Sequence, residues 1–252
     1  MKNPLKEKLL RGEAVIGTFA QIGHPDITEW LAKLGFDWLL LDAEHSPADF
    51  ESLQRMMQSM NGTECVPIVR PQWNEPVVIK RVLDLGAYGV LIPWVNSKEE
   101  AENAVKFCKY PPEGIRGWGP RRAGMFDDDY FKTANDELLI AVQIETVAAL
   151  KNLDEIFSVA GIDACYIGPW DLSVSMGFGV PPKWDDPKYS AAFDKVLDAA
   201  KRYGKAAGMF ATIDNVEWAL DKGFKFVSVD DDDTFLILGA QMALDKTRRQ
   251  RT

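Results

Sequence analysis

The chain of 252 residues lacks the features that mark secreted and membrane proteins. Its three cysteines, Cys65, Cys108 and Cys165, are far apart and form no Cys-x-x-Cys pair, so we expect small buried thiols of a reducing compartment. Residues 1–12 are charged and contain no apolar signal-peptide segment, and no apolar run reaches the ~18 residues of a membrane span. We therefore expect a cytoplasmic protein that does not associate with membranes.

Positive charge is also scarce. The chain has 29 Lys and Arg residues against 38 Asp and Glu residues, which gives a formal net charge of −9. Binding to nucleic acid or to an anionic membrane surface needs a basic face, so this balance argues against both partners. An anionic substrate would have to be attracted locally, by a metal ion or by a few arginines.

Short apolar runs alternate with helical patterns along the whole chain. The predicted strands are 15–20, 38–42, 66–70, 89–93, 138–144, 164–167, 206–210 and 226–229. The predicted helices include 25–34, 75–85, 97–110, 148–159, 189–203, 214–222 and a last helix to about Lys246. Such alternation predicts a parallel sheet, and eight units in ~250 residues predict a single α/β domain over 1–252, a closed (β/α)8 TIM barrel. The alternative, an open doubly wound sheet, usually carries a Gly-rich phosphate loop, and the sequence has none.

Two strands are followed by acids at equivalent places. The apolar run 138–142 is followed by Gln143 and Glu145, and 164–167 is followed by Gly168 and Asp171. Carboxyl ends of parallel strands meet at one end of a barrel, so Glu145 and Asp171 could hold one divalent cation, with Mg²⁺ or Mn²⁺, or Co²⁺, suited to oxygen ligands. The alternative is that both acids only favour the amino ends of helices.

Other polar residues follow the predicted strands. His45 lies beside Asp42 and Glu44, as a general base oriented by a carboxylate would, although a capping or packing role is the alternative. Arg70 ends an apolar strand, where it would pair with a carboxylate or stabilise an oxyanion. We interpret His24 as structural.

The last strand leads into the run 230–233, whose four acids we expect to cap the last helix.

No predicted strand ends in lysine, since Lys205 and Lys225 lie at strand starts. A Schiff-base mechanism therefore lacks its nucleophile.

These motifs together resemble the class II pyruvate aldolases of the HpcH/HpaI type, in the phosphoenolpyruvate/pyruvate superfamily. The similar segments are Leu41-Asp42-Ala43-Glu44-His45, Val69-Arg70, Gly89-Val90-Leu91-Ile92-Pro93, Tyr110-Pro111-Pro112-x-Gly114-x-Arg116-Gly117, Gln143-x-Glu145 and Ile167-Gly168-Pro169-x-Asp171-Leu172-Ser173. That family includes 4-hydroxy-2-oxoheptanedioate aldolase and 2-dehydro-3-deoxyglucarate aldolase. The resemblance covers almost the whole chain.

The resemblance implies Mg²⁺- or Mn²⁺-dependent cleavage of a 4-hydroxy-2-oxo acid to pyruvate, or a close 2-oxo acid, and an aldehyde. It implies that Glu145 and Asp171 bind the metal, that His45 is the base and that Arg70 steadies the enolate. The implied pyruvate site is Gln143 with the backbone of Gly168, Pro169 and Trp170. In the family pattern, the acid that raises the basicity of the histidine corresponds to Asp84. By position in the sequence, Asp42 is the nearer candidate for this role.

The resemblance also implies a homo-hexamer, a trimer of dimers, with the last helix exchanged between barrels. The long loop 111–133 carries Trp118, Arg121 and Arg122, which either shape the aldehyde end or only make subunit contacts. Two alternatives to the aldolase are a citramalyl-type lyase acting on a thioester and a catalytically silent metal-binding barrel.

Overall fold

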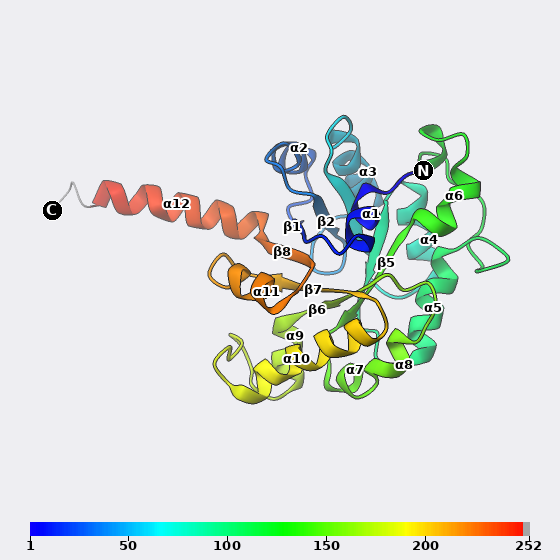
Figure 1. Ribbon diagram of the computed structural model, residues 1–252. Helices are drawn as coiled ribbons and strands as arrows, with labels where there is room; N and C mark the ends of the chain where they lie inside the picture. The colour runs from blue at the N-terminus through cyan, green and yellow to red at the C-terminus, as the bar shows by residue number, and fades with distance from the viewer. Residues whose placement is uncertain (249–252) are drawn as a thin grey trace.

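The protein is an eight-stranded parallel barrel surrounded by helices (Figure 1), as a computed structural model of the chain shows for residues 1–248. Each strand pairs with the next, and the last strand pairs with the first to close the barrel. The strands are β1 (Val15–Ala20), β2 (Trp38–Asp42), β3 (Val66–Arg70), β4 (Gly89–Ile92), β5 (Leu139–Ile144), β6 (Ala164–Ile167), β7 (Ala206–Ala211) and β8 (Phe226–Asp231). The predicted TIM barrel is therefore confirmed.

Helices alternate with these strands. They are α1 (Pro4–Leu10), α2 (Pro25–Lys33), α3 (Phe50–Ser59), α4 (Pro76–Asp84), α5 (Lys98–Cys108), η1 (Ala123–Met125), α6 (Tyr130–Glu137), α7 (Val147–Lys151), α8 (Leu153–Phe157), α9 (Pro169–Ser175), α10 (Pro187–Arg202), α11 (Val216–Lys222) and α12 (Asp232–Arg248). Local signals begin several of them: the Ser97 and Glu100 side chains form a capping box at the start of α5, and the His24 ring accepts from the Asp26 N–H at the start of α2.

Three local predictions were wrong. The helix predicted over 148–159 is broken into α7 and α8 at Asn152, whose side chain donates to the Asn96 carbonyl at 2.7 Å. The loop 111–133 ends early, because α6 begins at Tyr130. The acids at 230–233 do not all cap the last helix: Asp231 accepts from the Thr234 N–H, but Asp232 accepts from the backbone of Gln21 and Ile22 after β1.

The barrel has two apolar cores, as alternation along the strands requires. One fills the interior, with Trp38, Leu40 and Tyr166 among its members, and the other lies between the strands and the outer helices. Leu5 and Leu9 of α1 belong to the interior core, so α1 closes the amino-terminal end of the barrel.

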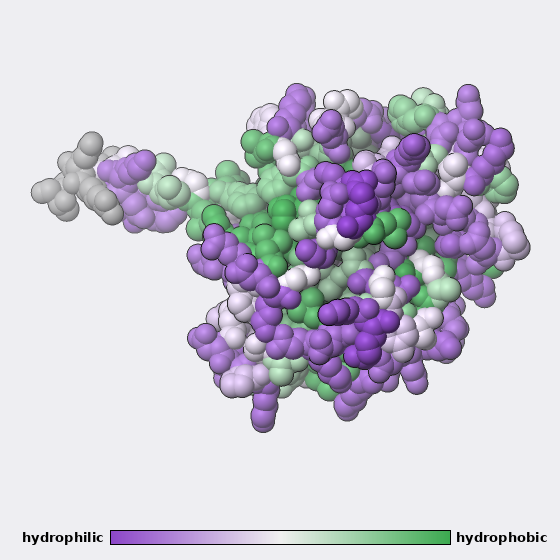
Figure 2. Space-filling model, viewed as in Figure 1, coloured by the Kyte–Doolittle hydropathy of each residue, from purple (hydrophilic) through white to green (hydrophobic). Residues whose placement is uncertain are grey.

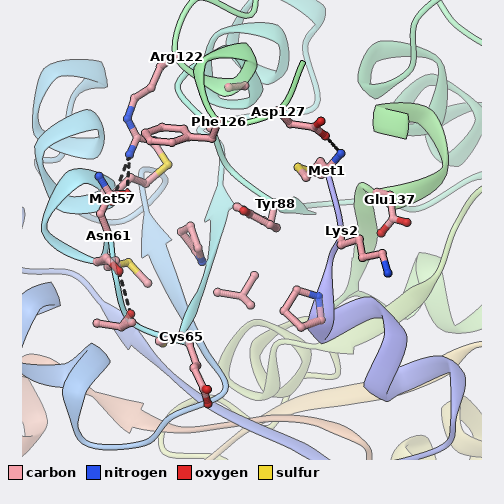
Figure 3. A pocket seen from close by; sticks show the side chains of 18 of the residues that line it. Met1, Lys2, Met57, Asn61, Cys65, Tyr88, Arg122, Phe126, Asp127 and Glu137 are labelled. Carbon is pink, nitrogen blue, oxygen red and sulfur yellow. Dashed lines mark hydrogen bonds and ion pairs between the residues drawn. The ribbon is translucent and has the colours of Figure 1, made fainter. Parts of the chain in front are cut away.

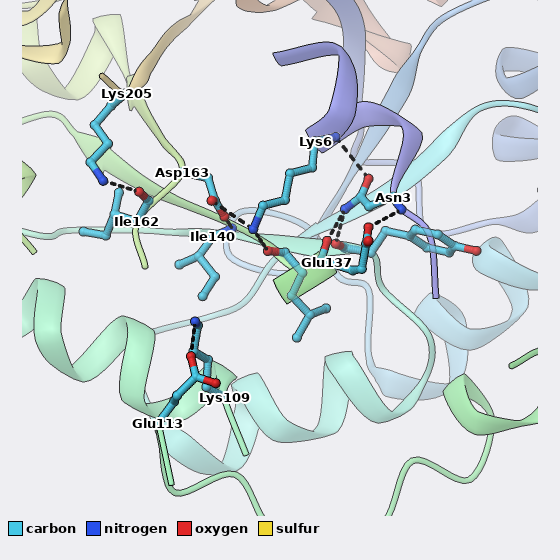
Figure 4. A network of polar contacts seen from close by, with 11 residues as sticks. Asn3, Lys6, Lys109, Glu113, Glu137, Ile140, Ile162, Asp163 and Lys205 are labelled. Carbon is cyan, nitrogen blue, oxygen red and sulfur yellow. Dashed lines mark hydrogen bonds and ion pairs between the residues drawn. The ribbon is translucent and has the colours of Figure 1, made fainter. Parts of the chain in front are cut away.

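Polar contacts hold α1 across that end (Figure 4). Asn3 donates to the Tyr88 and Glu137 carbonyls at 2.8 and 2.9 Å, and Lys6 lies 2.9 Å from both the Leu138 carbonyl and Asp163. With this end closed, the opening of the barrel interior is at the carboxyl ends of the strands.

The last helix leaves the body of the molecule. Figure 1 shows α12 projecting away from the barrel, and only its first part contacts β8 and β1. Its exposed apolar side chains are Leu236, Ile237, Leu238, Met242 and Leu244. Figure 2 shows hydrophobic surface where this helix leaves the barrel, next to a mostly hydrophilic surface. No helix among the described residues is both long and apolar enough to cross a membrane.

Candidate active site

Strand alternation decides which strand-end residues face the interior. Trp38 and Leu40 of β2 belong to the interior core, so Asp42, two residues further on, also points inward. Ile68 of β3 places Arg70 inside in the same way. Asp42 and Arg70 are partners in the register of these adjacent strands, so the barrel sets them side by side.

The Asp42 carboxylate holds the Arg70 guanidinium in a bidentate pair. Arg70 Nε donates to Oδ1 and Nη2 donates to Oδ2, each at 2.8 Å, and both residues are buried. The remaining nitrogen, Nη1, lies 3.2 Å from Oε2 of Glu44, although that oxygen has no aligned hydrogen-bond donor among the described residues. Of the two roles expected for Arg70, the structure shows pairing with carboxylates, and this pairing fixes the plane of the guanidinium.

Glu145 lies just beyond β5 and receives two hydrogen bonds. The Trp94 backbone N–H donates to Oε1 at 2.8 Å, and Gln143 Nε2 donates to Oε2 at 2.6 Å. Burial raises the pKa of Glu145 to about 8; the Trp94 N–H opposes this shift, while Asp171 and Glu44 add to it. A carboxylate in this environment favours a proton or a nearby cation.

The turn from β6 into α9 brings the second acid to the same place. Gly168 is the N-cap of α9, and Asp171 lies in its first turn. A Cβ on Gly168 would come 2.6 Å from Glu145 Oε2 and 2.9 Å from Gln143 Nε2, so only glycine lets this turn pack against the Glu145 side chain. Asp171 follows the strand next to that of Glu145 and lies near enough to raise its pKa further.

A cavity of about 190 Å³ opens at this end of the barrel. Its lining includes seven of the predicted site residues: His45, Arg70, Gln143, Gly168, Pro169, Trp170 and Asp171. Asp42 and Glu145 support it through their hydrogen bonds to Arg70 and Gln143. The carbonyl oxygen of the Gln143 side chain is buried without a hydrogen-bond partner among the described residues, so it is a free acceptor at the site.

His45 and its two proposed supporting acids do not form one group. His45 is exposed at the mouth, and its Nε2 lies 3.7 Å from Glu44 Oε2. Both Asp42 oxygens are occupied by Arg70, so the carboxylate beside His45 is Glu44 and not Asp42. Burial raises the pKa of Glu44, which Arg70 and His45 oppose.

Asp84 lies at the other end of the barrel, because α4 runs antiparallel to the strands and Asp84 is its last residue. There it accepts from Arg116 Nη2 at 2.7 Å.

The loop after α5 also lies at the amino-terminal end of the barrel, since it leads into the start of β5. Trp118 packs against Tyr110 and Phe131, and Arg122 donates to the Leu85 carbonyl at 2.6 Å. Figure 3 shows Arg122 and Phe126 beside a separate hollow of about 990 Å³ near α1. Within one protomer, this loop cannot shape the aldehyde end of the cavity.

Several lining residues were not predicted from the sequence: Phe19, Gln21, Tyr166, Phe210 and Asp231. The available signal was strand alternation, because Phe19 follows Val15 and Gly17 on the inward face of β1. Apolar side chains at strand ends have the same sequence pattern as ordinary core residues, so the sequence does not distinguish them as site residues.

Comparison with known proteins gives consistent results. The family model described as "HpcH/HpaI aldolase/citrate lyase" matches residues 15–237. A relative from Salmonella paratyphi C named "4-hydroxy-2-oxo-heptane-1,7-dioate aldolase" is 41% identical over 246 residues, covering 96% of this chain and 93% of the relative.

Two solved structures share the fold over nearly their whole length. A family protein from Burkholderia cenocepacia J2315 is 29% identical with a TM-score of 0.93, covering 98% of this chain and 100% of that one. An HpcH/HpaI aldolase from Desulfitobacterium hafniense DCB-2 is 31% identical with a TM-score of 0.90, covering 97% and 96%.

Proposed function

Because the chain belongs to the HpcH/HpaI aldolase/citrate lyase family of carbon–carbon lyases, we propose that it is a divalent-metal-dependent aldolase of 4-hydroxy-2-oxo acids. The products of cleavage are pyruvate, or a close 2-oxo acid, and an aldehyde. The observation that carries this proposal is that Asp171 and the clamped Arg70 line one small cavity, and that Glu145 lies beside it, close enough for Asp171 to raise its pKa.

The donor set fits a hard divalent cation such as Mg²⁺ or Mn²⁺. Glu145 and Asp171 supply carboxylate oxygens, which these ions prefer. Burial raises the pKa of Glu145, the negative charges of Asp171 and Glu44 add to the shift, and a bound cation would favour the ionised carboxylate. Gln143 offers an unpaired carbonyl oxygen beside them. Held by the two acids, the cation would act as a Lewis acid toward the oxygens of a 2-oxo acid.

The protein groups account for the rest of the reaction. Cleavage breaks the C3–C4 bond: His45 at the mouth takes the proton of the 4-hydroxyl, C4 becomes the aldehyde carbon, and the electron pair of the bond passes to the pyruvate enolate. Return of that proton to C3 then gives pyruvate. Arg70 uses Nε and Nη2 on Asp42, and Nη1, which lies 3.2 Å from Glu44 Oε2 without an aligned hydrogen bond, would donate to the enolate oxygen. Gln143 and the Gly168 backbone bind the 2-oxo acid.

Asp84 can support His45 only from a second protomer, since within one protomer it pairs with Arg116 at the opposite end of the barrel. The same holds for a role of Trp118 and Arg121 at the aldehyde end. We propose both roles only across a contact between two copies of the chain.

The test is release of pyruvate from a panel of 4-hydroxy-2-oxo acids, with and without chelator. We expect chelation to abolish turnover and Mg²⁺ or Mn²⁺ to restore it. Borohydride with pyruvate should not inactivate, because no lysine lines the cavity among the described residues. Turnover that survives chelation, or a pyruvate adduct on a lysine found by mass spectrometry, would refute the mechanism.

Glu145→Gln and Asp171→Asn test the metal pair directly. Each should abolish both turnover and Mn²⁺ binding measured by calorimetry, while circular dichroism stays that of the wild type. Asp154→Asn, which removes an exposed acid on α8, is the matched control and should change neither. Wild-type turnover in either of the first two variants at low Mg²⁺ would show that the assignment is wrong.

A further inference from the structure

We propose that the aldehyde end of this site accepts an uncharged apolar aldehyde, selected by the side chains of Phe19, Trp170 and Phe210. This inference rests on the proposed aldolase function and adds the chemical class of the second substrate. It concerns the part of the cavity that the 2-oxo acid does not use.

The cavity has one polar side and one aromatic side. Arg70, Gln143 and Asp171 make the polar side, where the oxygens of the 2-oxo acid would bind. The aromatic side comes from three different elements, β1, β7 and α9, which bring Phe19, Phe210 and Trp170 together.

The Phe210 ring packs against both of the others. Phe210 meets Phe19 edge to face at 5.2 Å between ring centroids, and it meets Trp170 at 5.2 Å and 90°. Such geometry is favourable for aromatic pairs and gives a rigid apolar surface. The Arg70 guanidinium lies 5.1 Å from the Phe19 ring centroid, so the aromatic side chains are next to the group that would donate to the enolate. A substituent on C4 that leaves the polar side therefore meets the rings.

The charges of the lining disfavour an anionic tail. Arg70 is the only Lys or Arg among the described residues that line the cavity, and both Asp42 oxygens already bind it. His45 lies beside Glu44, and Asp231 adds a further acid to the rim. Within one protomer, a carboxylate on the aldehyde would lose its water without gaining a cationic partner, which is costly. The volume of about 190 Å³, below the usual ~300–1,000 Å³ of ligand pockets, limits the size of the aldehyde substituent.

The inferred preference differs from the substrate in the name of the relative, 4-hydroxy-2-oxo-heptane-1,7-dioate. Cleavage between C3 and C4 of that seven-carbon substrate yields pyruvate from C1–C3 and 4-oxobutanoate, an aldehyde with a carboxylate, from C4–C7. For the present chain we expect its neutral isostere, 4-methylpentanal, to be the better partner of pyruvate.

The experiment compares these two aldehydes in pyruvate addition by the full-length, metal-loaded enzyme. We expect kcat/KM for 4-methylpentanal to exceed that for 4-oxobutanoate by at least about tenfold, the effect of burying an unpaired charge. Equal use of both aldehydes, or preference for 4-oxobutanoate, overturns the inference.

Two variants test which residues cause the preference. Phe210→Ala should lower kcat/KM for 4-methylpentanal about tenfold or more, well beyond any loss in exchange of the pyruvate methyl protons with solvent. Asp231→Asn keeps an acceptor for the Thr234 N–H but removes a charge, and it should raise kcat/KM for 4-oxobutanoate. The control is Tyr203→Ala, since Tyr203 is as exposed as Trp170 (37%) but lies at the end of α10 and does not line the cavity.

Proton exchange separates the two proposals. Wild-type exchange that requires metal, with no preference between the aldehydes, supports the aldolase and refutes the apolar pocket. Absence of both exchange and addition refutes the aldolase and the inference with it. A Phe210→Ala variant that loses exchange and addition equally shows a structural role and also overturns the inference.

Discussion

The orientation of Arg70 is set by its bidentate pair with Asp42, and this makes arginine irreplaceable at the position. A lysine has one flexible ammonium that cannot both hold Asp42 and reach an enolate oxygen. We expect Arg70→Lys to lower kcat by roughly 10²-fold or more, as removal of an oxyanion donor does, and not to improve on Arg70→Ala.

The exchange of pyruvate methyl protons with solvent tests where Arg70 acts, because it passes through the enolate without an aldehyde. Arg70→Lys should slow this exchange as much as it slows cleavage. If exchange keeps the wild-type rate while cleavage is lost, Arg70 serves the aldehyde end and its placement beside the enolate is wrong.

The three cysteines are buried free thiols, in agreement with the expectation of small core residues. Burial raises the pKa of Cys65, Cys108 and Cys165 to about 12, so almost no thiolate is present near neutral pH. We expect iodoacetamide at pH 8 to leave the native protein unlabelled and to add three groups after denaturation, as seen by mass spectrometry. Rapid labelling of the native protein would contradict this.

Among the secondary-structure elements, the β6–α9 turn is the one whose backbone packs directly against the Glu145 side chain. Gly168→Ala would bring a Cβ within 2.6 Å of Glu145 Oε2, so the carboxylate must shift. We expect a loss of at least about tenfold in kcat/KM, as sub-ångström misplacement at a reacting centre causes, together with weaker Mn²⁺ binding and an unchanged circular dichroism spectrum.

Gly124→Ala in η1 is the matched control, because a Cβ there meets only Pro120 at 3.7 Å. Full activity in Gly168→Ala would show that the close approach of the turn to Glu145 does not matter for function.

In the molecule as a whole, α12 is the helix that projects from the barrel with its apolar side chains exposed. A helix with apolar residues around most of its circumference is normally buried. Leu236, Ile237 and Met242 are each 64% exposed in the single chain. We therefore expect α12 to pack against a second copy, in keeping with the helix exchange and hexamer implied by the family resemblance.

Replacement of two of these residues tests that expectation. Ile237→Glu with Met242→Glu should lower the molar mass measured by light scattering, while the barrel stays folded by circular dichroism. Gln241→Glu adds one charge to the same helix and should leave the mass unchanged. An unchanged mass in the double variant would show that α12 does not form the contact between copies.

Local sequence patterns are sufficient to predict the barrel and most of its polar site. Strands and helices follow from the spacing of apolar residues, and parallel strands must present their carboxyl ends together. Arg70, Glu145 and Asp171 can therefore be assigned to one end of the barrel from their positions after predicted strands. The family comparison confirmed the resemblance drawn from the same motifs.

The arrangement of side chains between those strand ends depends instead on the tertiary fold. Closure of the barrel brings Phe19 of β1 against Phe210 of β7, although 190 residues of sequence separate them. It also places Asp84 and the loop of Trp118 at the opposite end, because a residue that follows a helix and one that follows a strand lie on opposite faces of the barrel. These contacts depend on the path of the whole chain, and no local pattern of residues specifies them.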